Sequence, residues 1–249
     1  MQRPVLAANW KMNNGPTEAR AFIAAFAARW TPRNDRAIIF FPPAISLTTV
    51  VHALGARTDI AVGAQNISPE DKGAFTGETS APMAKDAGAR YVLVGHSERR
   101  HVFGETDAET ARKCAAVARH GLTAILCVGE LLAERESGMT RDVVLRQLHA
   151  GWEQLSRDAI VSMAIAYEPV WAIGTGKTAT PDDASTVHAE IRAALRKRLG
   201  DPADSVPILY GGSVSRTNAA SLLAAQDVDG LLVGGASLDV SSWVSICEA

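Results

Sequence analysis

The segment beginning near residue 163 carries the side chain best suited to proton transfer. An apolar run, residues 163–167, ends in one carboxylate, Glu168, followed at once by Pro169 and then by a short stretch with Trp171 and two glycines. This order predicts a strand, a base at its tip, and a loop with stiff ends and a pliable middle. Reactions that remove a proton and must exclude water need a positioned carboxylate and a cover that closes. An exposed acid in a surface turn is the alternative that this segment alone leaves open.

A second acid–base group is His96, which lies between an apolar run and the predicted start of a helix. Ser97 is predicted to cap that helix. The positive end of a helix lowers the pKa of an imidazole and favours its neutral form, which can donate a hydrogen bond to a carbonyl and exchange protons with it. Glu98 is expected to steady a neighbouring cation such as Lys11. A core histidine with satisfied hydrogen bonds remains the alternative for His96.

Two glycine pairs predict a binding site for phosphate. Gly211 and Gly212, before Ser213, and Gly234 with Gly235 each join a predicted strand to the next segment. Without side chains in the way, backbone N–H groups at such turns can surround an anion. Either pair alone could be only a tight turn. Together, after the last two strands, they match the usual phosphate site of eight-stranded barrels, and they explain how a chain of net charge −2 binds a dianion.

The elements that position these residues alternate between short apolar runs and longer alanine-rich amphipathic stretches. Strands buried on both faces are apolar throughout, as these runs are. Eight strands are predicted, at Val5–Ala8, Ala37–Phe41, Ile60–Ala64, Tyr91–Gly95, Thr123–Val128, Ser162–Tyr167, Pro207–Tyr210 and Gly230–Val233. Helical spacing predicts helices over Thr17–Trp30, Thr106–Arg119, Thr140–Leu155 and Asp182–Leu199.

Eight strand–helix units in 249 residues predict an α/β fold, a single (β/α)8 barrel domain spanning residues 1–249. The rival is an open doubly wound sheet. Its dinucleotide-binding version needs a GxGxxG motif after the first strand, which is absent, and its flavodoxin-like version needs only about five strands.

In a barrel of this kind, functional residues gather after the strands at one face. Six of the eight predicted strand ends carry polar or glycine signals, which would meet at a single rim. They are Asn9 and Lys11, Gln65 and Asn66, His96 to Glu98, Glu168, Gly211 to Ser213, and Gly234 with Gly235.

Composition excludes several classes of protein. A net charge of −2 and a pI near 6.3 argue against nucleic-acid binding. No apolar run reaches the roughly 18 residues of a membrane span, and the first residues hold no secretory core. Three cysteines without CxxC spacing predict a reducing, cytoplasmic location rather than disulfides or zinc. Incomplete Walker, nucleophile-elbow and zinc-deaminase patterns leave no expected metal and no covalent nucleophile.

With these residues assembled, the chain resembles the triosephosphate isomerases nearly from end to end. Eight segments match motifs of that family in the family's order. They are Asn9–Met12, Gly63–Asn66, Gly73–Glu78, Gly95–Arg100, Cys127–Glu130, Ala166–Lys177, Tyr210–Val214 and Leu232–Ser237.

The resemblance implies interconversion of dihydroxyacetone phosphate and glyceraldehyde 3-phosphate without a cofactor, in glycolysis and gluconeogenesis. Glu168 would be the base, His96 the neutral electrophile, and Lys11 with Asn9 would stabilise negative charge. Backbone groups of Gly174, Ser213, Gly234 and Gly235 would hold the phosphate. Pro169, Val170 and Trp171, with Lys177, Thr178 and Ala179, would be the two hinges of a lid.

The segment from Gln65 to Glu78 is long for a connection between a strand and a helix, and it holds Phe75 and Thr76. The resemblance implies that it docks into a twin subunit to form a homodimer, with Glu78 and Arg99 ordering the interface. Two rival functions remain open on the residues alone. One is another phosphate-binding barrel enzyme, such as a sugar-phosphate epimerase, and the other is a non-catalytic sugar-phosphate binder.

Overall fold

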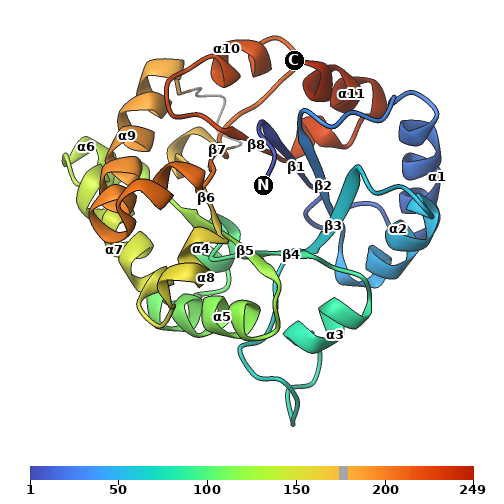
Figure 1. Cartoon of the computed structure of the whole chain (residues 1–249), viewed down its shortest axis with the longest axis horizontal. Helices are drawn as coiled ribbons and strands as arrows, with labels where there is room; N and C mark the ends of the chain where they lie inside the picture. The colour runs from blue at the N-terminus through green and yellow to red at the C-terminus, as the bar shows by residue number, and fades with distance from the viewer. Residues whose placement is uncertain (174–178) are drawn as a thin grey trace.

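Eight parallel strands form a closed barrel in which each strand pairs with its neighbours in chain order. The structure, a computed structural model, describes residues 1–173 and 179–249 (Figure 1). The predicted fold is therefore confirmed. The strands are β1 (Val5–Asn9), β2 (Ala37–Phe41), β3 (Ile60–Ala64), β4 (Tyr91–Val94), β5 (Thr123–Val128), β6 (Ala164–Tyr167), β7 (Ile208–Tyr210) and β8 (Gly230–Val233).

Helices surround the barrel, and the ring they form encloses all eight strands in Figure 1. The α-helices are α1 (Pro16–Ala27), α2 (Leu47–Leu54), α3 (Ala81–Asp86), α4 (Ser97–His101), α5 (Asp107–Arg119), α6 (Leu132–Glu136), α7 (Thr140–Trp152), α8 (Arg157–Val161), α9 (Pro181–Leu199), α10 (Ala219–Leu223) and α11 (Val240–Glu248). Short 3-10 helices are η1 (Ala44–Ser46), η2 (Val170–Ala172), η3 (Asp201–Ser205) and η4 (Gly235–Ser237). No described helix is both long enough and apolar enough to cross a membrane.

The four predicted helices correspond to α1, α5, α7 and α9, and two of their starts, those of α5 and α9, are capped by side chains. The Thr106 hydroxyl accepts the Glu109 backbone N–H, and the Glu109 carboxylate accepts the Thr106 N–H, which forms a capping box before α5. Thr180 and Asp183 repeat this arrangement before α9. The predicted helices at 17–30 and 140–155 end three residues early, because tertiary packing rather than spacing sets where a helix stops.

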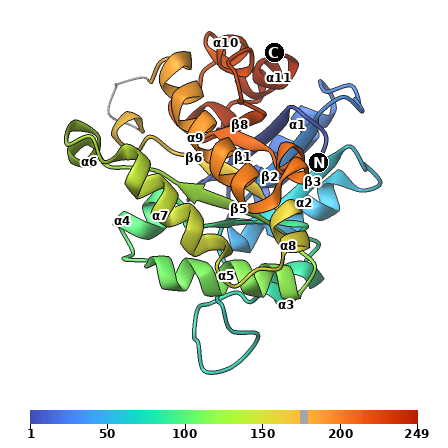
Figure 2. The same cartoon turned by 60° about the vertical axis from the view of Figure 1, so that its left-hand side comes forward.

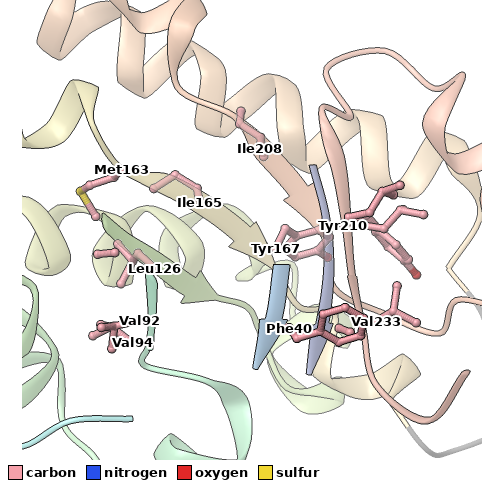
Figure 3. Packing of buried hydrophobic residues seen from close by; sticks show 14 of the residues in the cluster. Phe40, Val92, Val94, Leu126, Met163, Ile165, Tyr167, Ile208, Tyr210 and Val233 are labelled. Carbon is pink, nitrogen blue, oxygen red and sulfur yellow. The ribbon is translucent and has the colours of Figure 1, made fainter. Parts of the chain in front are cut away.

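Alternation along the strands creates two apolar layers. One set of side chains fills the barrel interior, for example Val5 and Ala7 of β1 with Ala164 and Ala166 of β6. The intervening side chains face the helices and build the larger outer core. Figure 3 shows members of this outer layer, among them Leu126, Ile165 and Ile208. The barrel interior is thus filled with side chains and is not an open channel.

The segment between β3 and α3 projects away from the barrel in both views (Figures 1 and 2). Phe75 lies in this segment with 48% of its surface exposed. An exposed aromatic ring on a projecting loop is typical of a surface that contacts another protein chain.

Candidate active site

A cavity of about 310 Å³ opens at the carboxyl-terminal end of the barrel. Every predicted catalytic or substrate-binding residue that the structure describes lines it. These residues are Asn9, Lys11, His96, Glu168, Ser213, Gly234 and Gly235. Gly174, also predicted to bind substrate, lies outside the described residues. Residues from five strand ends, spread over more than 220 positions, thus share one small space.

Strand alternation places the first two of these side chains. In β1, Val5 and Ala7 face the barrel interior, and Asn9 is the next position on that face. In β6, Ala164 and Ala166 face the interior, and Glu168 follows them on the same face just beyond the strand. Both polar side chains therefore point along the barrel axis into the cavity rather than toward the helices.

His96 reaches the cavity by a different route. Gly95 has a φ of +69°, a left-handed conformation that ends β4 and turns the chain into α4. His96 then caps α4 with its own ring, because Nδ1 accepts the Glu98 backbone N–H at 3.2 Å. The prediction that Ser97 is the cap is wrong. The bond to Nδ1 requires a lone pair there, so the ring carries its proton on Nε2, facing the cavity.

Glu168 rests against His96 and Ser97 with only 2% of its surface exposed. Its Oε1 lies 3.0 Å from His96 Nε2 and accepts the Ser97 hydroxyl at 3.1 Å, and its Oε2 accepts the Ser97 N–H at 3.0 Å. Burial raises the pKa of Glu168, but its electrostatic interaction with the Nε2–H of His96 and these hydrogen bonds together hold it below its ordinary value. The carboxylate is therefore ionised and held ready beside the cavity.

The predicted lowering of the His96 pKa is wrong for this arrangement. Burial lowers the pKa of the ring, but the negative charge of Glu168 and its hydrogen bond raise it, and the net shift is upward. The helix end is a smaller influence than a carboxylate in direct contact. The upward shift depends on Glu168 resting on the ring.

Lys11 is held in the cavity wall by three neighbours. Its Nζ lies 2.7 Å from Glu98 Oε1, which confirms the predicted pairing. Its backbone has a φ of 51°, costly for a non-glycine residue, and is fixed by hydrogen bonds from its N–H to Asn9 Oδ1 and from Gln65 Nε2 to its carbonyl. Strain of this kind persists only where the surroundings impose it. The ammonium group is thereby fixed at the cavity.

A side chain would be crowded at three positions of the glycine segments, whereas a Cβ on Gly235 would meet open space. A Cβ on Gly211 would lie 2.9 Å from Glu168 Cγ, and one on Gly212 would lie 2.2 Å from the Tyr210 hydroxyl. A Cβ on Gly234 would approach Lys11 Cε to 3.3 Å. All four glycines line the cavity, so a phosphate there can approach their peptide groups closely.

The first predicted hinge is built around Trp171. Pro169 leads into η2, and Trp171 Nε1 donates to Oε1 of the fully buried Glu130 at 2.8 Å. The Tyr167 hydroxyl donates to the same oxygen at 3.1 Å. Of the second predicted hinge, Ala179 is buried, while Lys177 and Thr178 lie outside the described residues.

Sequence reasoning gave no role to Ser97 as a partner of Glu168, nor any to Glu130. Glu130 follows β5 by two positions. The end of this strand was not among the six predicted strand ends with polar or glycine signals. Treating it like the others would have found this residue.

Four of the five predicted interface residues lie in the segment between β3 and α3, and Arg99 lies on α4. Gln65 bonds to the carbonyls of Lys11 and Phe41 within its own chain. Thr76 and Glu78 lie close to Phe75, Thr76 being exposed. Arg99 donates to Glu105 at 3.3 Å and stacks over the exposed Phe103 ring.

The described residues form no recognisable metal-binding site. Within residues 1–173 and 179–249, no group of three or more His, Cys, Asp or Glu side chains is placed to hold an ion. The polar groups around the cavity are instead an acid–base pair, a cation and peptide groups.

Comparison with known proteins agrees with this geometry. The family model described as triosephosphate isomerase matches residues 4–249. The chain is 49% identical to triosephosphate isomerase of Moorella thermoacetica over 247 residues, covering 99% of this chain and 98% of that one. It is 47% identical to the Marinobacter nauticus protein of the same name, covering 100% and 98%. A crystal structure of triosephosphate isomerase from Bartonella henselae superposes with a TM-score of 0.89 at 41% identity, over 99% of this chain and 98% of that one. The chain belongs to the triosephosphate isomerase family.

Proposed function

We propose that the protein interconverts dihydroxyacetone phosphate and glyceraldehyde 3-phosphate without a cofactor, as a step of glycolysis and gluconeogenesis. The observation that carries the proposal is the contact between Glu168 and His96 at the wall of a cavity shared with Lys11 and two glycine segments. Family membership supports the same reaction.

Glu168 is the base in this mechanism. In its resting position the Ser97 and His96 hydrogen bonds lower its pKa and make it a weak base. Turning the side chain into the cavity breaks the Ser97 bonds and leaves burial, which raises the pKa, as the main influence. The same movement that brings the carboxylate to the substrate carbon thus makes it a stronger base. It takes the proton from one carbon and returns it to the next.

His96 acts on the oxygens. Once Glu168 turns away, the Nε2 proton is free to be donated to the substrate carbonyl, and the carboxylate that raises the pKa of the ring is gone. The ring then shuttles protons between the two oxygens of the enediolate. A positioned base contributes roughly 10²–10⁴-fold and an oxyanion donor roughly 10²–10³-fold.

Lys11, with Asn9 beside it, stabilises the negative charge that develops on the substrate. Backbone groups of Ser213, Gly234 and Gly235, with Gly174, hold the phosphate. The assignment is supported by the position of Ser213, Gly234 and Gly235 in the lining of the cavity, beside Lys11.

A lid closes over the cavity with hinges at Pro169, Val170 and Trp171 and at Lys177, Thr178 and Ala179. The described residues before and after the proposed lid support it. Trp171 is tied to buried Glu130, and Ala179 is buried against the outer core. Both are firm points from which a connecting segment can swing.

The protein acts as a homodimer in the cytoplasm. Exposed apolar side chains support a partner surface, in particular Met12, Ile45 and Phe75 on strand–helix connections and Val102 and Phe103 between α4 and α5. Gln65, Phe75, Thr76, Glu78 and Arg99 contribute to that interface. Three buried free thiols, on Cys114, Cys127 and Cys247, support a reducing compartment. Sedimentation of a monomer at every concentration would contradict the dimer.

A coupled isomerase assay separates the candidate functions. The purified protein is given each triose phosphate, and then a pentulose phosphate in an epimerase assay. The proposal expects rapid triose interconversion and no epimerisation. Epimerisation alone would support the rival enzyme, and phosphate binding without turnover would support a binder.

A further inference from the structure

We infer that Gln147, on α7, is a positioning residue that holds the backbone supporting Glu168; this inference rests on the proposed isomerase function. Gln147 lies on the buried face of α7, with only 4% of its surface exposed. It does not touch the cavity. A buried side-chain amide in an apolar layer needs hydrogen-bond partners, because an unpaired one loses its bonds to water without replacement.

Both ends of that amide are bonded to a single residue. Gln147 Oε1 accepts the Gly129 N–H at 2.8 Å, and Gln147 Nε2 donates to the Gly129 carbonyl at 3.2 Å. Gly129 is the first residue beyond β5, where the ladder with β6 has ended at Val128. The amide therefore pairs with Gly129 as a neighbouring strand would, and it fixes a stretch of backbone that has left the sheet.

That stretch lies directly beneath the base. A Cβ placed on Gly129 would lie 1.7 Å from the backbone carbonyl oxygen of Glu168. The Glu168 N–H donates to Val128 O at 2.8 Å, and the Val170 N–H donates to Glu130 O at 3.2 Å. Residues 128–130 thus support residues 168–170 from both sides of the point that Gln147 holds.

The consequence concerns both the base and the hinge. If Gly129 shifts, the Glu168 backbone in contact with it shifts too. Glu130 moves as well, and with it the acceptor for Trp171. A displacement of about 1 Å in a catalytic group can cost roughly 10²-fold in rate. Ser213, Gly234 and Gly235, three of the four residues proposed to bind phosphate, follow β7 and β8 and are not hydrogen-bonded to Gln147, so affinity for inorganic phosphate should change far less than kcat.

The test uses two substitutions at position 147, Gln147→Met and Gln147→Glu, and a control in which another glutamine is replaced by methionine. Gln147→Met removes both hydrogen bonds and keeps the side-chain length. Gln154→Met, at an exposed position past the end of α7, is the matched control. We expect kcat of Gln147→Met to fall about 10–100-fold, while KM and inhibition by inorganic phosphate stay within about threefold. The control should match the parent protein.

Gln147→Glu supplies a readout that a purely structural role would not give. One carboxyl oxygen still accepts the Gly129 N–H, but the other can donate to the Gly129 carbonyl only when protonated. We therefore expect kcat near that of the parent at low pH, falling as the carboxyl ionises between about pH 5 and 9, with no such ionisation in the parent.

Three results would overturn the inference. One is normal kcat in folded Gln147→Met, and another is a KM effect equal to the kcat effect. The third, decisive if Gln147→Met does not fold, is a pH profile of Gln147→Glu identical to that of the parent. Lack of isomerase activity in the parent would instead refute the proposed function, and the inference would fall with it.

Discussion

The two ends of the barrel both bury charged groups but hold them in opposite ways. At the amino-terminal end, Arg192 is 3% exposed, and its donors meet the carbonyls of Ala203 and Val206 and the carboxylates of Asp227 and Asp229. At the carboxyl-terminal end, the Glu168 carboxylate meets His96 and Ser97 beside an open cavity. The first group is surrounded by partners. The second has space to turn.

This difference separates stability from catalysis within one fold. The guanidinium of Arg192 ties together the loop before β8 and the turn before β7, and Asp229 also accepts the backbone N–H of Ile208. Its contacts are all to groups of the protein itself, so its role is to stabilise the fold. Glu168 can exchange its hydrogen bonds for a substrate, so part of its stabilising contribution is available for function.

Replacing Arg192 by Met should give the largest change in stability. It removes the buried cation that pairs with Asp227 and Asp229 and a donor to the carbonyls of Ala203 and Val206, which costs about 3–5 kcal/mol of unfolding free energy. Urea denaturation measures this loss. The folded fraction should keep the parent kcat. Arg196→Met on the same helix, where the side chain is 60% exposed and paired with Asp204, should cost at most about 1 kcal/mol. Equal losses in both variants would break the comparison.

His96→Gln should show the reverse pattern. The glutamine amide can donate a hydrogen bond to the substrate, but it cannot take up and release a proton near neutral pH. We expect kcat to fall about 10²–10³-fold, with unfolding free energy close to that of the parent. Steady-state kinetics and urea denaturation on the same preparation give both numbers. A variant that loses stability but keeps its turnover would place His96 with the structural groups.

The fold and the main site residues could be predicted from the sequence, but the contacts between those site residues could not. The apolar runs and their spacing predict all eight strands, because burial on both faces leaves a continuous hydrophobic signal. Glu168 and Asn9 are predictable site residues because they extend an inward-facing set of strand positions. Family resemblance supplied their roles, which residue spacing alone left open.

The contacts that were missed depend on distances across the fold. Ser97 looks like a helix cap because it precedes a helical segment, and only the structure brings its hydroxyl to a carboxylate 71 residues away. The His96 pKa was predicted from its own helix, yet the charge of Glu168 outweighs that effect. Gln147 gives no signal at all within an amphipathic helix. Local sequence patterns predict the helices and strands. The contacts between side chains far apart in the sequence form only when the barrel closes.

A smaller test uses the pH dependence of the unfolding free energy. It concerns His188, which is hydrogen-bonded to Asp227, one of the partners of Arg192. The ring is buried beside Tyr167 and bonded to the Asp227 carbonyl, and burial lowers its pKa to about 4. In the unfolded chain its pKa is about 6.5, so below that pH the unfolded state binds the proton more tightly and stability falls as pH falls toward 4.

Between pH 7 and 5 this group alone should cost the parent about 2 kcal/mol of unfolding free energy. His188→Phe removes the titration, so its loss over the same interval should be smaller by that amount. Urea denaturation at both pH values measures the two losses. Parallel losses in the two proteins would show that His188 does not contribute.

Ser97→Ala should have the smallest effect, and it concerns pH rather than rate. The variant loses the hydroxyl donor to Glu168 but keeps the Ser97 backbone N–H. With one donor fewer, the pKa of Glu168 is lowered less, so the acid limb of the kcat/KM profile should move to higher pH. The maximal rate should change less than about tenfold. An acid limb that does not move would mean that Glu168 does not rest on Ser97 in solution.

The most direct measurement is the turnover of Glu168→Gln together with its affinity for inorganic phosphate. The amide keeps the size of the side chain and removes the base. The account predicts a fall in kcat of about 10³-fold or more, phosphate inhibition within about threefold of the parent, and undiminished resistance to urea. Turnover near that of the parent would contradict the assignment of Glu168 as the group that moves the proton.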